Sequence, residues 1–95
     1  MLPRYLITNG VQNMATTVTR TQTGVRIESS LLKVLKGLAE YTNLTLGDLI
    51  EGIVLHAFEG KAPFSTETCE VIAQLKSVYG CNLTAADSHK LAEND

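Results

Sequence analysis

The chain has 95 residues, of which 44% are hydrophobic and 19% are charged, and its formal net charge is −2. A chain of this length forms one domain with a small core, which oligomerisation often completes. The composition is typical of neither a disordered protein nor a strongly basic nucleic-acid binder.

Charge is divided unevenly along the chain. Residues 1–39 carry five basic side chains and one acid, a net of +4, whereas residues 40–95 carry three basic side chains and nine acids, a net of −6. This asymmetry indicates either a basic face that meets an anion or simply a dipolar protein, and charge alone favours neither interpretation.

The N-terminal residues 1–16 have no clear hydrophobic period, and we expect a flexible extension there, with Met14 as a candidate for the biological start. Residues 5–19 are rich in Thr, Asn and Gln, unlike the apolar segment of a signal peptide. We expect no membrane-spanning segment. With only two cysteines, the sequence predicts a cytoplasmic protein with reduced thiols.

Residues 17–27 alternate in polarity and are rich in β-branched side chains, which predicts a β-strand. Its two faces carry Thr21, Thr23, Val25 and Ile27 on one side and Arg20, Gln22, Gly24 and Arg26 on the other. Because a single strand leaves its backbone donors and acceptors unpaired, we expect it to pair with a second copy of the chain.

After the predicted strand, the apolar residues recur at the spacing of an α-helix. A first helix is predicted from about Ser30 to Thr42, with Ser29 or Ser30 as its cap. Thr45 and Asp48 resemble a capping box at the start of a second helix. Its apolar positions are Leu46, Leu49, Ile50, Ile53, Val54, Ala57 and Phe58.

Two further helices are predicted in the C-terminal third. Gly60 ends the second helix, and a third begins at a cap of Ser65 or Thr66 and ends at Gly80. Thr84 followed by Asp87 repeats the capping pattern, which predicts a short fourth helix over residues 85–92.

The order of one strand, a helix, a tight turn and a second helix is carried by the segment VRIESSLLKVLKGLAEYTNLTLGDLIEGIV, residues 25–54. Over residues 22–59 the chain resembles the ribbon-helix-helix family of Arc-like and CopG-like DNA-binding proteins. The resemblance implies a mainly α fold in which the strand pairs antiparallel across an obligate homodimer. Residues 17–61 would form this unit, and residues 62–95 would add one or two accessory helices.

The resemblance also implies which residues do what. The base contacts would be Gln22, Gly24 and Arg26. The phosphate contacts would be Arg20, Thr21, Thr45 and Leu46, the last two because a helix N-terminus attracts anions. The dimer core would contain Thr23, Val25, Ile27, Leu31, Leu35, Leu49, Ile50 and Ile53.

The leading hypothesis is therefore a sequence-specific regulator of transcription, either a small repressor or an antitoxin-like protein, that reads the major groove of double-stranded DNA with a two-stranded ribbon. It would be a homodimer or a tetramer. The alternative is a dimeric interaction module that keeps the fold but no longer binds DNA. Gly24, Leu46 and the negative net charge favour the alternative, with a protein partner on the acidic C-terminal segment.

Catalysis and metal binding have no support in the sequence. No nucleophile, base and oxyanion donor converge in a recognisable motif, so we expect neither an enzyme nor a cofactor. The spacings of Cys69, Cys81, His56 and His89 match no zinc pattern, and we expect no metal site. Cys69 falls on the apolar stripe of the third helix, which predicts a buried thiol.

Overall fold

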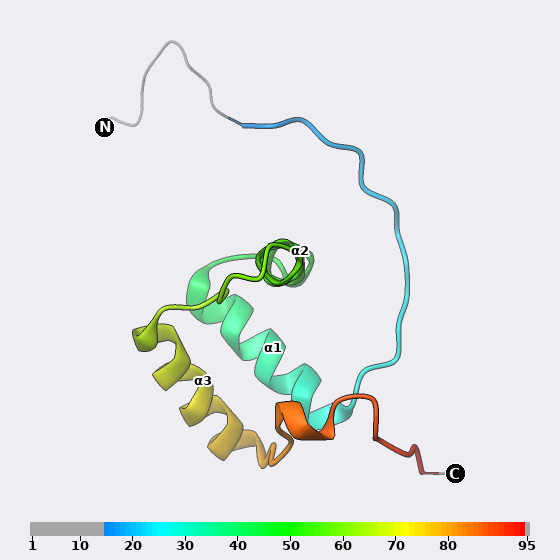
Figure 1. Ribbon diagram of the computed structural model, residues 1–95, viewed down its shortest axis with the longest axis vertical. Helices are drawn as coiled ribbons and strands as arrows, with labels where there is room; N and C mark the ends of the chain where they lie inside the picture. The colour runs from blue at the N-terminus through cyan, green and yellow to red at the C-terminus, as the bar shows by residue number, and fades with distance from the viewer. Residues whose placement is uncertain (1–14, 95) are drawn as a thin grey trace.

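The computed structural model describes residues 15–94, and this part of the chain forms three α-helices and one 3-10 turn. The elements are α1 (Ser29–Thr42), α2 (Leu46–Phe58), α3 (Thr66–Tyr79) and the turn η1 (Ala85–Asp87). In Figure 1, α1 lies between α2 and α3, and residues 15–28 run outside the helices as an extended arm. The expectations for a flexible N-terminal extension and for a start at Met14 concern residues that lie largely outside this description.

A carboxylate caps the N-terminus of α1. Glu28 accepts hydrogen bonds from the hydroxyl of Ser30 at 2.7 Å and from the backbone N–H of Leu31 at 2.8 Å. The prediction of a serine cap is therefore wrong, because the acid that precedes the serines reaches the same free amide. At the other end, Asn43 has a φ of 60°, a left-handed conformation that asparagine tolerates better than most residues.

The limits of α2 agree with the sequence pattern. Thr45 caps the helix, since its hydroxyl oxygen accepts a hydrogen bond from the backbone N–H of Asp48 at 3.1 Å. At the C-terminus, Gly60 has a φ of 70°, and the N–H of Lys61 returns to the carbonyl oxygen of His56 at 2.8 Å. These local hydrogen bonds confirm the predicted start and end of the helix.

Helix α3 also has the predicted ends. The hydroxyl of Ser65 accepts a hydrogen bond from the N–H of Thr68 at 3.2 Å, and Gly80 ends the helix in the left-handed conformation. The ammonium group of Lys76 then donates to the carbonyl oxygen of Leu83 at 2.7 Å. This bond holds the following segment against α3.

The predicted fourth helix over residues 85–92 does not form. Only η1 is present, and the carboxylate of Asp87 accepts a hydrogen bond from the N–H of Thr84 at 2.8 Å. His89 has a φ of 65°, outside the range that a right-handed helix allows. The capping pattern is thus real, but the helix that it starts is interrupted after one turn.

The core is small and centred on α1. Leu38 and Ala39 are buried together with Leu49 of α2, and five partly buried side chains pack around them: Leu35, Ile53, Phe64, Ile72 and Leu75. Helix α1 packs more extensively against α3 than against α2. Both helices therefore contribute to the core, α2 through the buried Leu49 and α3 through the partly buried Ile72 and Leu75.

The predicted strand is absent, which corrects the expected fold. Residues 15–94 contain helices and coil but no strand, and between residues 16 and 27 no backbone group is hydrogen-bonded to another described residue. The physical reason is that a strand needs a second extended segment to complete its ladder, and the described chain provides none. The three predicted longer helices are present, whereas the predicted antiparallel ribbon is wrong.

Candidate nucleic-acid interface and apolar surface

The arm is coil that runs outside the helices, and most of its side chains are exposed. Gln22 and Thr21 are exposed, and Val25 retains 74% of its surface. A Cβ added at Gly24 would meet no atom within 4 Å. The alternating side chains predicted for DNA contact are therefore presented to solvent, on backbone whose donors and acceptors also face water.

Arg20 is the point at which the arm contacts α2. Its Nε and Nη2 donate to the two carboxylate oxygens of Glu51 at 2.9 and 2.8 Å, a bidentate arrangement. The same Nη2 lies 3.4 Å from a carboxylate oxygen of Asp48. Arg20 thus bridges two acids on the first turns of α2.

These contacts change the titration of both partners. The hydrogen bond to Glu51, with the charge of that carboxylate, raises the pKa of Arg20. Reciprocally, the hydrogen bond from Arg20 lowers the pKa of Glu51 below its ordinary value of 4.5. Both side chains are open to solvent, so the pair is a surface ion pair that salt screens.

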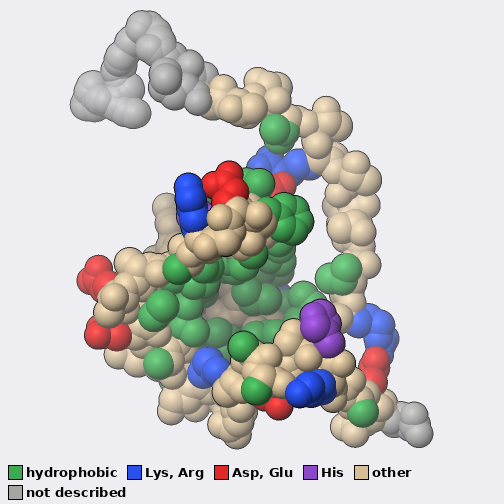
Figure 2. Space-filling view, viewed as in Figure 1, with side chains coloured by type: hydrophobic (Ala, Val, Ile, Leu, Met, Phe, Trp, Pro, Cys, Tyr) green, Lys and Arg blue, Asp and Glu red, His purple; other side chains and the backbone are tan. Residues whose placement is uncertain are grey.

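Arg26, at the other end of the arm, forms an ion pair with Glu93 of the C-terminal tail. Both side chains remain largely exposed. In Figure 2, basic and acidic side chains meet at two places along the arm, near its start above α2 and near the C-terminal tail. Both arginines predicted to contact DNA are therefore paired with carboxylates of the same chain.

The N-terminus of α2 was predicted to hold a phosphate through Thr45 and Leu46. The hydroxyl oxygen of Thr45 accepts the hydrogen bond that caps the helix, as predicted, and the side chain of Leu46 is half-buried. Asp48 lies in the first turn, where its negative charge already complements the positive end of the helix dipole. An incoming phosphate would meet this carboxylate.

The residues predicted for a dimer core occupy different environments in the single chain. Leu49 is buried and Leu31 is exposed. Leu35, Ile50, Ile53 and Ile27 are half-buried, whereas Thr23 and Val25 on the arm are exposed. The structure therefore brings Leu35, Leu49 and Ile53 together in one cluster and leaves Thr23 and Val25 of the arm uncovered.

An apolar surface on α2 is the feature that sequence reasoning missed. Leu55 is 63% exposed and Phe58 is 82% exposed, although Phe58 was placed in the core stripe. Val54 is also exposed, at the same helical face. The available signal was that α2 is apolar around most of its circumference, which is typical of a helix covered on more than one side.

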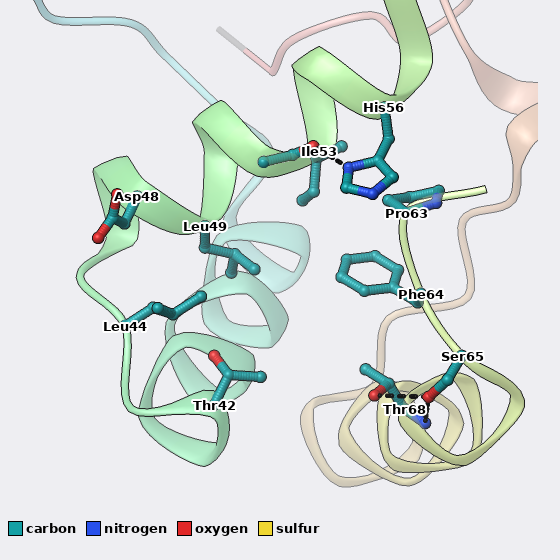
Figure 3. Close-up of a pocket in the computed structure, with 11 residues that line it drawn as sticks. Thr42, Leu44, Asp48, Leu49, Ile53, His56, Pro63, Phe64, Ser65 and Thr68 are labelled. Atoms are coloured by element: carbon teal, nitrogen blue, oxygen red, sulfur yellow. Dashed lines mark hydrogen bonds between the residues drawn. The ribbon is translucent and has the colours of Figure 1, made fainter. Parts of the chain in front are cut away.

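A cleft of about 280 Å³ lies between α2, the end of α1 and the start of α3. Figure 3 shows Leu44 and Leu49 on one side of it, and Phe64 facing them from the segment before α3. His56 lies at the edge, where its Nδ1 is 2.7 Å from the carbonyl oxygen of Gly52. Five of its eleven lining residues have apolar side chains, and its titratable residues are Asp48 and His56.

Neither thiol is in a metal cluster. Within residues 15–94, no three His, Cys, Asp or Glu side chains gather in a way that could hold a metal ion. Cys81 is buried and Cys69 is exposed, and both are free. The prediction of a buried Cys69 is wrong, because its side chain is exposed on α3.

The chain was compared with known proteins by sequence and by structure. No family model, no curated protein and no solved structure matches it. In the described part of the chain, none of the helices has the length and apolar character that crossing a membrane requires. The assignment of function therefore rests on the arm and on the apolar surface of α2.

Proposed function

We propose that this chain is a homodimeric DNA-binding regulator of transcription that contacts double-stranded DNA with its arm. The observation that carries the proposal is the arm itself. Its side chains alternate in polarity and include two arginines. The backbone of residues 16–27 forms no hydrogen bond with the rest of the described chain. Within the described chain, the arm's contacts with the helices and the C-terminal tail include the ion pairs of Arg20 and Arg26. Its exposed donors are those that groove contacts require.

The charge distribution supports an anionic partner. The N-terminal 39 residues have a net charge of +4 within a chain whose total is −2. Lys33 and Lys36 are exposed on α1, directly after the arm. The resemblance of residues 22–59 to ribbon-helix-helix regulators points to the same ligand, although the arm in this chain is coil.

We propose that the chain self-associates through an exposed surface of α2. The uncovered side chains of Leu55 and Phe58 form an apolar surface on a helix that already packs against α1 through its other face. Exposed apolar surface of this kind marks an interaction site. A second copy of the chain would cover it and enlarge a core that contains only five buried apolar residues among those described.

In the proposed mechanism, two arms of the dimer enter the major groove. Arg26 donates two hydrogen bonds to guanine and Gln22 pairs with adenine, as their side-chain geometry allows. Gly24 has no side chain, so the backbone approaches the base edges closely there. Arg20 and Thr21 face the phosphates beside the groove.

The test is a titration with duplex DNA. A preferred sequence is selected from a random pool and then titrated at low and high salt. We expect tight binding that weakens steeply with salt, because Lys and Arg displace condensed counterions. Arg26→Ala should remove about 1–3 kcal/mol of discrimination between the selected and a scrambled duplex.

Lys61→Ala is the matched control for Arg26→Ala. It removes the same charge from an exposed side chain outside the arm, between α2 and α3. It should leave discrimination unchanged. If the pool yields no preferred sequence and random duplex is not bound at low salt, DNA is not the ligand.

A second function is favoured by a specific observation. Arg20 and Arg26 are both engaged by carboxylates, and Asp48 stands where a phosphate would bind α2. A dimeric module that binds another protein through the acidic α3 and the C-terminal segment accounts for these ion pairs directly. Absence of DNA binding together with a stable dimer would select this alternative.

A further inference from the structure

The arm is fixed to the helical unit at two points by opposite charges. At the first, the guanidinium of Arg20 is 2.8 Å from an oxygen of Glu51 and 3.4 Å from an oxygen of Asp48. At the second, Arg26 is paired with Glu93. These partners come from α2 and from the C-terminal tail, which are far from the arm in sequence.

The ion pairs reverse the charge that the arm presents. Two arginines are matched by three carboxylates, so the two contact points together carry a net charge of −1. A phosphate that approaches Arg20 meets two like charges within hydrogen-bonding distance of the same guanidinium. The arm is thus electrostatically unsuited to a polyanion while these contacts persist.

We infer that Asp48, Glu51 and Glu93 form an acidic clasp that restrains the arm and competes with DNA phosphates for its two arginines. This inference rests on the proposed function, since it concerns how the same arm is regulated. Opening the clasp frees two guanidinium groups and separates them from the acids. Arg20 and Arg26 can then bind either DNA or the acids of the clasp, but not both at once.

The geometry makes the competition direct. Glu51 occupies Nε and Nη2 of Arg20, the fork that a phosphate would use for a bidentate contact. Glu51 lies on α2, so its contact with Arg20 joins the arm to that helix. Figure 1 shows the path of residues 15–28 outside the helices. Release of Arg20 therefore changes both the charge and the freedom of the arm.

The clasp is weak enough to open. All of its side chains are substantially exposed, and exposed ion pairs change equilibria by only a few-fold. A duplex that offers several phosphates can displace contacts of this strength. The clasp therefore lowers affinity without abolishing it and rejects weak or isolated anions.

The experiment compares two double variants with the same charge change. Asp48→Asn with Glu51→Gln opens the Arg20 contact. Glu67→Gln with Glu70→Gln is the control, because both acids are exposed on α3 and Glu67, like Asp48, lies in the first turn of its helix. Helix content and melting temperature are measured first for both variants.

Two readouts are needed. Backbone ¹⁵N relaxation without DNA reports the motion of residues 16–22, and titration with a random-sequence duplex at low salt reports affinity. We expect faster arm motion and about two- to five-fold tighter binding in the clasp variant. The control variant should show unchanged arm motion and a smaller increase in DNA affinity. It also removes two negative charges but does not touch the Arg20 contact, so only the long-range effect of charge remains.

Each result has a definite meaning. Unchanged arm motion in the clasp variant would show that Arg20 is not held by these acids and would overturn the inference. A released arm with unchanged or weaker DNA binding would show that the contact positions the arm instead of inhibiting it. If the arm is released but no variant binds DNA, the contact stands and DNA is rejected as both competitor and ligand.

Discussion

Gly37 of α1 lies directly against Leu75 of α3, and a Cβ added to Gly37 would be 3.0 Å from a terminal methyl carbon of Leu75. Glycine is normally unfavourable inside a helix, by roughly 0.5–1 kcal/mol relative to alanine. Its presence here allows the two helices to approach closely. The main helix contact of the core therefore depends on the absence of one side chain.

The first prediction concerns this contact. Gly37→Ala should lower the free energy of unfolding by about 1 kcal/mol, since crowding of the core exceeds the gain in helix propensity. Gly52→Ala is the control: Gly52 is also inside a helix, but its added Cβ would meet nothing within 4 Å. It should raise the free energy of unfolding by about 0.5–1 kcal/mol. Urea denaturation of both variants checks the difference, and equal effects would contradict the close approach.

The second prediction concerns self-association through α2. Phe58→Glu places a charge on the exposed apolar surface without disturbing the core of its own chain, because Phe58 is 82% exposed. If Phe58 is buried in the dimer, its replacement removes about 1.5–3 kcal/mol of favourable burial free energy from each copy. The dimer Kd should then rise at least about 100-fold. Sedimentation equilibrium measures this change.

Val78→Glu is the matched control for Phe58→Glu. Val78 is also an exposed apolar residue, but it lies on α3 and not on α2. Its substitution should leave the dimer Kd within about two-fold of the wild-type value, because changes at exposed positions away from an interface have small effects. A monomeric wild-type chain, or equal loss of dimer in both variants, would reject α2 as the dimer surface.

The helices could be predicted from the sequence because their signals are local. Thr45, Ser65 and Gly80 act on backbone groups within one turn, so their effect does not depend on the rest of the fold. The cap of α1 was misassigned because Glu28 and the following serines all have suitable oxygens.

The remaining features depend on residues far apart in sequence or on a second molecule. Periodicity placed Phe58 on an apolar face of α2, but no local signal says whether another element covers that face. The pair of Arg20 with Glu51 joins residues that are 31 positions apart. The strand failed for the same reason, since alternation describes the two faces of a strand and not the partner that its backbone needs.

The third prediction concerns pH. Glu51 has a lowered pKa because of Arg20, so the arm contact is fully present above the ordinary value of 4.5 and is lost as the pH falls through the lowered pKa. Arg20 remains charged throughout, and Asp48 is the other acid that faces it. Motion of residues 16–22, measured by ¹⁵N relaxation, should therefore be constant near neutral pH and increase only at acid pH.

The acid response of the arm must be separated from that of α1. Glu28 also has a lowered pKa, because the Ser30 hydroxyl and nearby backbone N–H groups hydrogen-bond its carboxylate, so acid weakens the cap of that helix as well. Asp48→Asn with Glu51→Gln removes both acids that contact Arg20 and leaves Glu28 in place. In this variant the arm should be mobile at every pH, whereas α1 should keep its response to acid. An arm that responds to pH without Asp48 and Glu51 would contradict the assignment.

The last prediction separates the two roles assigned to Thr45. Its hydroxyl oxygen accepts a hydrogen bond from the N–H of Asp48, so Thr45→Ala should lower the free energy of unfolding by about 0.5–2 kcal/mol. Thr45→Ser keeps the cap and should be nearly neutral. If Thr45 only caps α2, DNA affinity corrected for the folded fraction is the same in all three proteins, because the phosphate contacts come from the arm. A loss of corrected affinity in Thr45→Ala alone would show that the start of α2 also binds a phosphate, despite the carboxylate of Asp48 beside it.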